Sequence, residues 1–368
     1  MKEETIFISI ASYRDKLCNK TIKDIYNKAH KPNNIFIGIC QQNKEDVDTD
    51  CLHDINNPNI SIIRIPHFNA KGPTYARYLC STLYNGEQYY LQIDSHTIFI
   101  KNWDKICINM IKELKKISSK PVLSYYPKEI KDYVINDTGE NMYMVPRICK
   151  AYFNKQNIIS FLGSSIMNTN NEYYKVPYIA AGFIFSEASF LNEIPYDPTL
   201  DYLFTGEEIL LSVRFFTHGW DIYTPKINII FHEYLRSDEP KFWTDIKTYS
   251  DKNAINKINY YLKFGKQENV FINDKYGLGT IRTLDDFYNY TGINIDDKKV
   301  HTNFCIDGNL ATNEDIINSY ENRWIKEKFE ISNHHFTNNK NNKKCILIIV
   351  LIFLLYDVIQ KIIIKMRY

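Results

Sequence analysis

The chain has 368 residues, of which 44% are hydrophobic, including 28 Tyr and 21 Phe. This content of large apolar side chains excludes a disordered protein, and the length allows two packed lobes or one domain with appendages. The formal charge of +2 excludes a protein that coats a polyanion, so we expect no nucleic-acid partner.

The first 94 residues predict alternating strands and helices. Apolar runs predict strands at residues 5–11, 34–40, 61–65 and 89–94, and helices are predicted at 20–29 and from 73 to about 83. This alternation predicts an α/β fold with a mostly parallel central sheet flanked by helices. Such sheets bind ligands beyond the carboxyl ends of their strands, where residues 12–15, 41–42 and 94–96 lie.

The fourth predicted strand ends on the most informative pattern in the chain, an Asp-x-His. Alternate side chains of an extended segment point to the same side, so Asp94 and His96 project together while Ser95 faces away. A divalent cation held there would neutralise a diphosphate. The alternative is an ordinary polar turn after a strand, because short motifs of this kind often occur by chance.

The second half is more aromatic and less regular. It predicts strands at 178–185 and 227–232, a Pro-rich turn at 195–198, and a helix that begins at Gly206-Glu207-Glu208 and ends near 216. Such a region suits an acceptor-binding lobe, and a merely aromatic core is the alternative. We therefore predict a catalytic domain at 1–332, divided into a nucleotide-sugar half (1–110), an acceptor half (111–250) and a helical extension (251–332).

A polar linker is predicted at 333–344, before an apolar tail at 345–368. Residues 345–356 are all apolar, and the apolar character of 346–364 approaches the length that spans a bilayer. Asp357, Gln360 and Lys361 count against a span because polar groups are costly inside a membrane. We expect a C-terminal membrane anchor, with a buried or interfacial helix as the alternative.

The cysteines and the first residues bear on the compartment. All eight cysteines are scattered, and none forms a C-x-x-C pair, which predicts free thiols rather than a zinc knuckle or a disulfide framework. Only four residues precede the first apolar run, so no cleavable signal is expected before it. Together these features predict a cytoplasmic catalytic region that the tail attaches to a membrane.

Six motifs occur in order along the chain: residues 8–15 (ISIASYRD), 72–78 (GPTYARY), 92–96 (QIDSH), 180–183 (AAGF), 204–208 (FTGEE) and 231–234 (FHEY). With them, residues 5–296 resemble the cytosolic hydroxyproline-polypeptide N-acetylglucosaminyltransferase family. The resemblance implies a GT-A glycosyltransferase fold, UDP-GlcNAc as donor, a divalent metal and retention of anomeric configuration. The Asp-x-His with a late His also resembles the metal set of mucin-type polypeptide N-acetylgalactosaminyltransferases.

The metal set implied by the resemblance is Asp94, His96 and His232. One carboxylate and two imidazoles suit Mn²⁺, or another divalent cation such as Mg²⁺, that also binds two diphosphate oxygens. Alternatively, His232 only packs at a strand end. In that case His218 and His67 are weaker substitutes.

The nucleotide-sugar set collects polar and cationic residues at the predicted strand ends. Guanidinium groups suit phosphate oxygens, so both arginines of the set are placed near the diphosphate or uridine, with a solvated helix face as the alternative. The other polar side chains would bind uracil or ribose, or else cap turns. The complete set is Ser12, Tyr13, Arg14, Gln41, Arg77, Asp94 and Gly182.

Glu207 and Glu208 are the candidate catalytic carboxylates. Carboxylates at a helix start are often there only because they favour the helix dipole. The resemblance instead places this segment beside the sugar and the acceptor, with Glu207 first and Glu208 second as the group that orients a hydroxyl. Front-face attack and double displacement both remain open as the retaining mechanism.

The expected function is therefore a metal-dependent retaining transferase that moves GlcNAc from UDP-GlcNAc to a hydroxyl, with protein hydroxyproline as the acceptor that the resemblance implies. A first alternative keeps the fold but uses a different UDP-sugar and a glycan acceptor. A second alternative is a noncatalytic, membrane-tethered protein that binds sugar nucleotides, because a fold alone does not establish activity.

Overall fold

The computed structural model describes residues 4–133, 140–168, 172–265, 270–302 and 304. The described residues of 4–234 and 239–304 form a first compact unit, to which residues 235–238 do not belong. The predicted linker (333–344) and apolar tail (345–368) lie outside the described residues. Among the helices that are described, none has the length and apolar character needed to cross a membrane.

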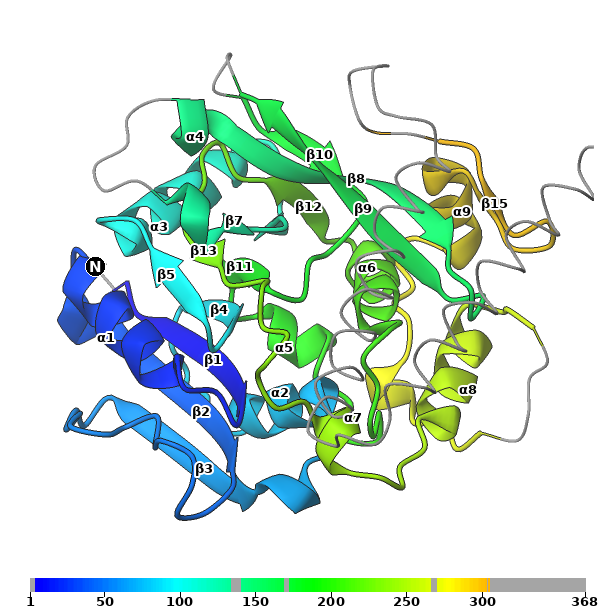
Figure 1. Cartoon of the computed structure of the whole chain (residues 1–368). Helices are drawn as coiled ribbons and strands as arrows, with labels where there is room; N and C mark the ends of the chain where they lie inside the picture. The colour runs from blue at the N-terminus through cyan, green and yellow to red at the C-terminus, as the bar shows by residue number, and fades with distance from the viewer. Residues whose placement is uncertain (1–3, 134–139, 169–171, 266–269, 303, 305–368) are drawn as a thin grey trace, which may run out of the picture. The chain divides into compact units, whose positions relative to one another are not determined.

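An eight-stranded sheet runs through the first unit (Figure 1). Its neighbouring strands β3, β2, β1 and β4 are parallel, β11 is antiparallel to both β4 and β6, β12 is parallel to β6, and β10 is antiparallel to β12. In sheet order the strands are β10 (Tyr174–Val176), β12 (Asp221–Thr224), β6 (Pro121–Ser124), β11 (Phe183–Glu187), β4 (Tyr89–Asp94), β1 (Ile6–Tyr13), β2 (Ile35–Asn43) and β3 (Ile60–Pro66).

Both faces of the sheet are covered, as expected from the continuous apolar run of β1. Ile6, Ile8 and Ile10 belong to one core cluster, with buried residues of α1 (Cys18–Lys28) and α3 (Trp103–Leu114). Phe7 points to the other face and joins a second cluster with α5 (Phe190–Glu193) and α6 (Glu207–Thr217). Helix α2 (Pro73–Ser81) contacts β1 and β2. Alternation along one strand thus produces a three-layer α/β arrangement.

Smaller elements complete the unit. A three-stranded sheet contains β5 (Thr97–Phe99), β13 (Ile230–His232) and β7 (Lys128–Glu129), and β8 (Met144–Phe153) forms an antiparallel hairpin with β9 (Ile159–Met167). The remaining elements are α4 (Glu140–Tyr143), α7 (Phe242–Asp245), α8 (Lys252–Tyr261), α9 (Leu284–Thr291) and the pair β14 (Ile293–Asn294) and β15 (Lys299–Val300). The small sheet matters most for function, because it continues directly from the end of β4.

The predicted α/β class and the four parallel strands of the first half are confirmed, each within three residues at its ends. The strand predicted at 178–185 is wrong in its first part, since β11 begins only at Phe183. The strand predicted at 227–232 is reduced to β13, which lies in the small sheet. The predicted helical extension contains α8 and α9 but also the β14–β15 pair, and the β8–β9 hairpin was not predicted.

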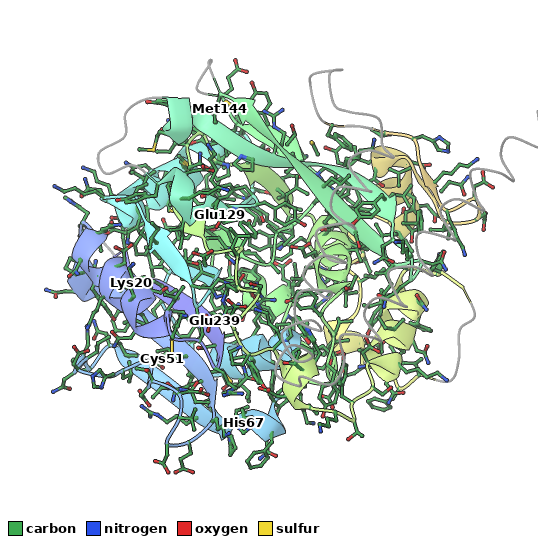
Figure 2. All side chains as sticks on the ribbon, viewed as in Figure 1. Lys20, Cys51, His67, Glu129, Met144 and Glu239 are labelled. Carbon is green, nitrogen blue, oxygen red and sulfur yellow. A yellow bond between two sulfur atoms is a disulfide. The ribbon has the colours of Figure 1, made fainter. Side chains whose placement is uncertain are left out.

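The prediction that all cysteines are free is wrong. Cys18 and Cys51 form a disulfide (Figure 2, beside the labelled Cys51), and Cys149 is also disulfide-bonded. Cys18 begins α1, and the fold brings it within a Cα–Cα distance of 5.1 Å of the loop that carries Cys51, 33 residues later. Sequence spacing alone does not reveal such proximity. Cys40, Cys80 and Cys107 are buried free thiols.

Candidate active site

The Asp94–His96–His232 set comes together at the carboxyl end of β4. Asp94 is the last residue of β4, and β5 begins at Thr97, so the turn between the two strands carries His96. Strand β13 pairs antiparallel with β5 and places His232 opposite Thr97. One ligand atom from each of the three side chains lies within 4.8 Å of the others. The predicted association of His232 with the Asp-x-His pair is therefore present.

Direct contacts join the members of this set. His232 Nε2 lies 3.1 Å from Asp94 Oδ2, and the two imidazole rings have centroids 4.5 Å apart. His96 Nδ1 lies 2.7 Å from Oδ2 of Asp15, a carboxylate from the loop that follows β1. His232 Nδ1, by contrast, is buried without a hydrogen-bond partner among the described residues. Of the two histidines, His96 therefore contacts a carboxylate outside the set, that of Asp15.

Arg77 ties the set to α6. This α2 residue is only 5% exposed, and its guanidinium donates to Asp94 Oδ1 at 2.9 Å and to Glu207 Oε2. Burial alone would lower the pKa of Arg77, but the charges of Glu207 and Asp94 raise it well above its ordinary value. Burial would likewise raise the pKa of Asp94, but His232, Arg77 and His96 hold it far below its usual range. Arg77 is therefore a buried counter-ion of Asp94 and Glu207, and the contact with the diphosphate or uridine predicted for it stays a prediction.

The two candidate carboxylates begin α6, directly after Gly206, whose φ of 106° favours glycine. Glu207 pairs with Arg77, although burial raises its pKa. Glu208 Oε1 accepts a hydrogen bond from the Ala181 N–H at 2.9 Å, and its Oε2 accepts one from the Tyr126 hydroxyl at 2.6 Å. Burial outweighs these bonds and raises the pKa of Glu208 to about 7.

Gly182 lies against the metal set, as the nucleotide-sugar prediction requires. A Cβ at this position would lie 3.2 Å from Asp94 Oδ2, tighter than an ordinary contact. The Ala181 N–H that binds Glu208 belongs to the preceding residue. The backbone at 181–182 therefore connects Glu208 to Asp94, and the missing side chain leaves the carboxylate room to turn toward a ligand.

The other predicted nucleotide residues are engaged elsewhere. Arg14 pairs with Asp48 and Asp245, each at 2.8 Å, and the Tyr13 hydroxyl also donates to Asp245, at 2.7 Å. Ser12 is fully buried and lies 3.5 Å from Cys51 Sγ.

Gln41 is fixed in the same way by the loop that carries the disulfide. Its Nε2 donates to Asp50 at 3.0 Å, and its Oε1 accepts from the backbone N–H of Cys51 at 2.7 Å. In this structure Ser12 and Gln41 therefore hold a loop in place. Neither substitute histidine joins the metal set, because His67 lies in a 3₁₀ turn and His218 Nδ1 lies 2.8 Å from the Arg214 carbonyl.

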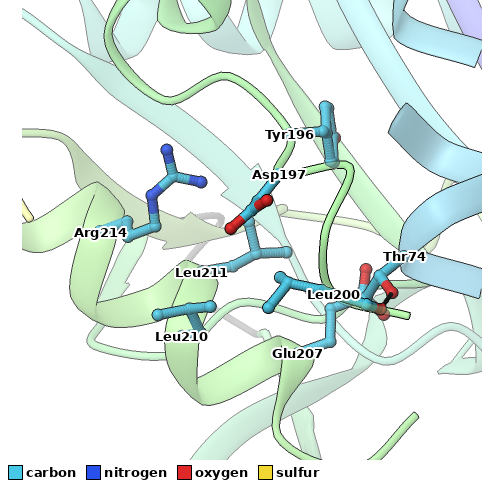
Figure 3. Close-up of a pocket in the computed structure, with 8 residues that line it drawn as sticks. All are labelled: Thr74, Tyr196, Asp197, Leu200, Glu207, Leu210, Leu211 and Arg214. Atoms are coloured by element: carbon cyan, nitrogen blue, oxygen red, sulfur yellow. Dashed lines mark hydrogen bonds between the residues drawn. The ribbon is translucent and has the colours of Figure 1, made fainter. Parts of the chain in front are cut away.

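A small cavity adjoins Glu207 on the side of α6. Figure 3 shows Thr74 and Glu207 at one side of it and Arg214 at the opposite side. Tyr196, Asp197 and three leucines complete the lining, and the space holds about one water molecule. The cavity is too small to hold a sugar. It is therefore a packing space beside α6 and not a substrate site.

The residues present fit a divalent cation. Asp94 offers a carboxylate oxygen and His96 and His232 offer ring nitrogens, which is a mixed set that Mn²⁺ accepts. The Asp94 side chain keeps 26% of its surface exposed, whereas that of Arg77 keeps 6%. Asp94 is therefore the most exposed of the three candidate ligands, since the side chains of His96 and His232 each keep only 11% of their surface exposed.

Solved structures are similar to this chain. The structure of GalNAc-T7 with UDP, GalNAc and Mn²⁺ is 15% identical with a TM-score of 0.50, covering 70% of this chain and 48% of that one. The structure of S. aureus TarS 1-349 with UDP-GlcNAc is 13% identical with a TM-score of 0.44, covering 70% and 66%. This chain thus spans about half to two thirds of the solved chains it resembles. No curated protein matches it.

The mixed sheet has the fold of GalNAc-T7, and the Asp–His–His set is a candidate site for a divalent cation. The family is defined by sequence: a family model described as glycosyltransferase (GlcNAc) matches residues 5–57 and 52–297. The chain belongs to this family.

Sequence reasoning missed Asp15 and Tyr126 as supports of the site. Asp15 stands in the first motif, but only the turn after β1 brings its carboxylate to His96. Tyr126 follows β6 and reaches Glu208 across 82 residues of sequence. Nothing in the local sequence pattern signals these long-range contacts.

Proposed function

We propose that this chain is a divalent-metal-dependent, retaining N-acetylglucosaminyltransferase that uses UDP-GlcNAc as donor. The observation that carries the proposal is the convergence of Asp94, His96 and His232 within 4.8 Å. Asp94 and His232 are 138 residues apart in sequence, so a separate strand pairing must be built to bring them together. Membership in the GlcNAc glycosyltransferase family supports the choice of sugar.

In this proposal the chain's own residues position the donor. Asp94, His96 and His232 would hold Mn²⁺ or Mg²⁺, and the cation would supply Lewis-acid stabilisation of the charge that develops on the departing diphosphate. Arg77 and Glu207 hold the Asp94 carboxylate in place, while Glu208 fixes the backbone at 181–182 beside it. Direct contact of either glutamate with a sugar or acceptor hydroxyl stays a prediction.

The diphosphate contact predicted for Arg14 also stays a prediction. Arg14 would have to leave Asp48 or Asp245 in order to bind a phosphate. Both partners are carboxylates, so an incoming diphosphate would compete with them for the same guanidinium face. Tyr13 shares Asp245 with Arg14 and would be released with it.

For the acceptor we propose a hydroxyl, with protein hydroxyproline as the first candidate because of the six ordered motifs. The purified chain should be incubated with UDP-GlcNAc and a panel of hydroxyproline peptides, serine peptides and glycans. Mass spectrometry would then detect the added sugar. Transfer to hydroxyproline supports the proposal, whereas transfer to glycans alone removes the hydroxyproline assignment and keeps the donor.

The donor is tested separately by metal-dependent release of UDP from a set of UDP-sugars. The proposal expects UDP-GlcNAc to be the best donor and chelation to stop the release. A preference for another UDP-sugar would change the sugar but not the enzyme class. Binding without any release or transfer would favour the noncatalytic alternative.

We also propose membrane attachment through residues 345–368, which the apolar run alone supports. The test is extraction of membranes from expressing cells with carbonate: the chain should stay with the membranes, and deletion of 345–368 should release it. Recovery of the whole chain in the soluble fraction would remove the anchor. Cytoplasmic placement stays a prediction, and the Cys18–Cys51 disulfide weighs against it, because disulfides persist mainly in oxidising compartments.

A further inference from the structure

Asp15 is a buried carboxylate that serves the metal set without belonging to it. Its side chain keeps 1% of its surface exposed. Its Oδ1 accepts a hydrogen bond from the backbone N–H of Leu17 at 2.9 Å. Its Oδ2 accepts one from the Ser95 hydroxyl at 2.5 Å and lies 2.7 Å from His96 Nδ1. The carboxylate therefore contacts a metal-ligand candidate through an oxygen that can only accept.

This contact decides which ring nitrogen of His96 carries the proton. A carboxylate accepts hydrogen bonds, so the neutral imidazole beside it holds its proton on Nδ1. The lone pair then lies on Nε2, which is the atom that a cation needs. We infer that Asp15 is a positioning residue that fixes the His96 tautomer and ring orientation for metal binding by Nε2. This inference rests on the metal site of the proposed function.

The neighbouring groups make Asp15→Asn a sharp test. The Leu17 N–H needs an acceptor, so the asparagine carbonyl should stay on Leu17, and its NH₂ group should take the place of Oδ2. That NH₂ would donate to His96 Nδ1 and move the ring proton to Nε2. The variant is nearly identical in size, but His96 would present an N–H to the cation instead of a lone pair.

The experiment measures Mn²⁺ affinity of the full chain by electron paramagnetic resonance, without any sugar nucleotide. Asp15→Asn should weaken Mn²⁺ binding about 10- to 100-fold, the usual effect of losing an outer partner of a metal-ligating histidine. Asp104→Asn is the matched control, because Asp104 is a buried carboxylate that accepts two backbone N–H bonds away from the site. It should leave Mn²⁺ affinity unchanged at a comparable loss of thermal stability.

The Ser95→Ala variant distinguishes an effect on the His96 tautomer from an effect on the packing around Asp15. It removes a donor from the same Asp15 oxygen but keeps the carboxylate on His96. We expect this variant to bind Mn²⁺ within about threefold of the wild type, well short of the 10- to 100-fold loss. Equal losses in Ser95→Ala and Asp15→Asn, or wild-type affinity in Asp15→Asn, would overturn the inference.

Nitrogen NMR of the histidine rings in the metal-free chain provides a second readout. The wild type should carry the His96 proton on Nδ1, and Asp15→Asn should carry it on Nε2. If Asp15→Asn does not fold, the wild-type spectrum still decides, because a proton on Nε2 contradicts the inference. If the wild type binds no Mn²⁺ while the ring proton lies on Nδ1, the proposed function fails and the role of Asp15 in orienting His96 stands.

Discussion

Asp94 is the residue on which the site converges. One of its oxygens accepts from Arg77 and the other lies 3.1 Å from His232, and Gly182 leaves space beside it. Burial would raise the pKa of this carboxyl, but the hydrogen bond with His232 and the charge of Arg77 hold it below its usual range. Arg77 also pairs with Glu207, so one positive charge faces two carboxylates, and a bound cation would offset the remaining negative charge.

His232→Ala should weaken Mn²⁺ binding by more than the 10- to 100-fold that follows the loss of an outer partner, because a ligand itself is lost. His218→Ala is the matched control, since His218 contacts the Arg214 carbonyl outside the metal set. Titration calorimetry with Mn²⁺ measures both variants. Equal affinities for the wild type and His232→Ala would exclude His232 as a ligand.

Glu208 should make stability depend on pH. Burial raises its pKa from 4.5 to about 7, so between these values the native state holds a proton that the unfolded chain has lost. The contribution of Glu208 to the free energy of unfolding is therefore fully present below about pH 4.5. It is lost as the pH rises through 7, and the loss amounts to up to about 3 kcal/mol.

Urea unfolding at several pH values, on the wild type and Glu208→Gln, measures this contribution. The variant should show a smaller decline between pH 5 and pH 8 than the wild type, because only the raised pKa of Glu207 remains. A wild-type stability that stays constant over this range, or the same decline in both proteins, would show that Glu208 has no raised pKa.

The sequence predicted the residues of the site unevenly. Asp94 and His96 were predicted from the alternation of side chains in an extended segment, but β4 ends at Asp94 and His96 lies in the following turn. Ser95, which was expected to face away, contacts the same Asp15 oxygen as His96. The assignment of His232 to the site came from the family resemblance. Local sequence could not predict it, because the pairing of β5 with β13 is what brings His232 near Asp94 and His96. Ser12 and Gln41 do lie at strand ends, but a loop held by the disulfide packs over them. The sequence pattern gives no sign of such a cover.

At the scale of elements, the start of α6 sets the position of Glu207 and Glu208. Gly206 has a φ of 106°, and a Cβ there would lie 2.6 Å from Cδ1 of Ile258 in α8. The turn thus needs glycine for its conformation, and an alanine there would also require the end of the Ile258 side chain to shift.

Gly206→Ala should therefore destabilise the fold by about 1 to 3 kcal/mol from backbone strain, with a further cost from the clash. Gly86→Ala is the control, since Gly86 has a similar φ of 95° but no atom near its Cβ position. Thermal unfolding of the two variants should show the larger loss in Gly206→Ala. Equal losses would mean that the contact with α8 has no effect on stability.

The disulfide between α1 and the following loop predicts a defined pattern of thiol labelling. In denatured, unreduced protein, iodoacetamide should modify Cys40, Cys80 and Cys107 and should leave Cys18 and Cys51 unmodified. Peptide mass spectrometry reads the pattern, with prior reduction as the control that exposes every thiol. Modification of Cys18 and Cys51 without reduction would show that the pair is not bonded.

Elements were predictable where local sequence determines them. Strands β1, β2, β3 and β4 are continuous apolar runs between helices, which is the pattern of a buried parallel sheet. The β8–β9 hairpin was missed because β8 contains Pro146 and a register shift between Ile148 and Lys150, so its side chains do not alternate regularly. Its pairing comes from a partner strand rather than from local preference.

In the compact unit as a whole, β4 lies at the boundary between the parallel strands of the sheet and its first antiparallel neighbour. The strands on one side of it, β1, β2 and β3, are parallel, and its other neighbour β11 is antiparallel. Asp94 ends β4, and Gly182 immediately precedes β11. The site therefore lies at the carboxyl edge where the two parts of the sheet meet, the place at which open α/β sheets bind ligands.

We propose that the Asp94–His96–His232 set binds the cation on which UDP-sugar turnover depends. The most direct measurement is UDP release from UDP-GlcNAc by the full chain after chelation and again after Mn²⁺ is restored, for the wild type and His96→Ala. We predict that the wild type loses turnover on chelation and recovers it with Mn²⁺, whereas His96→Ala stays inactive at the same metal concentration. Turnover that persists in the chelated wild type, or full activity of His96→Ala at limiting Mn²⁺, would contradict the claim.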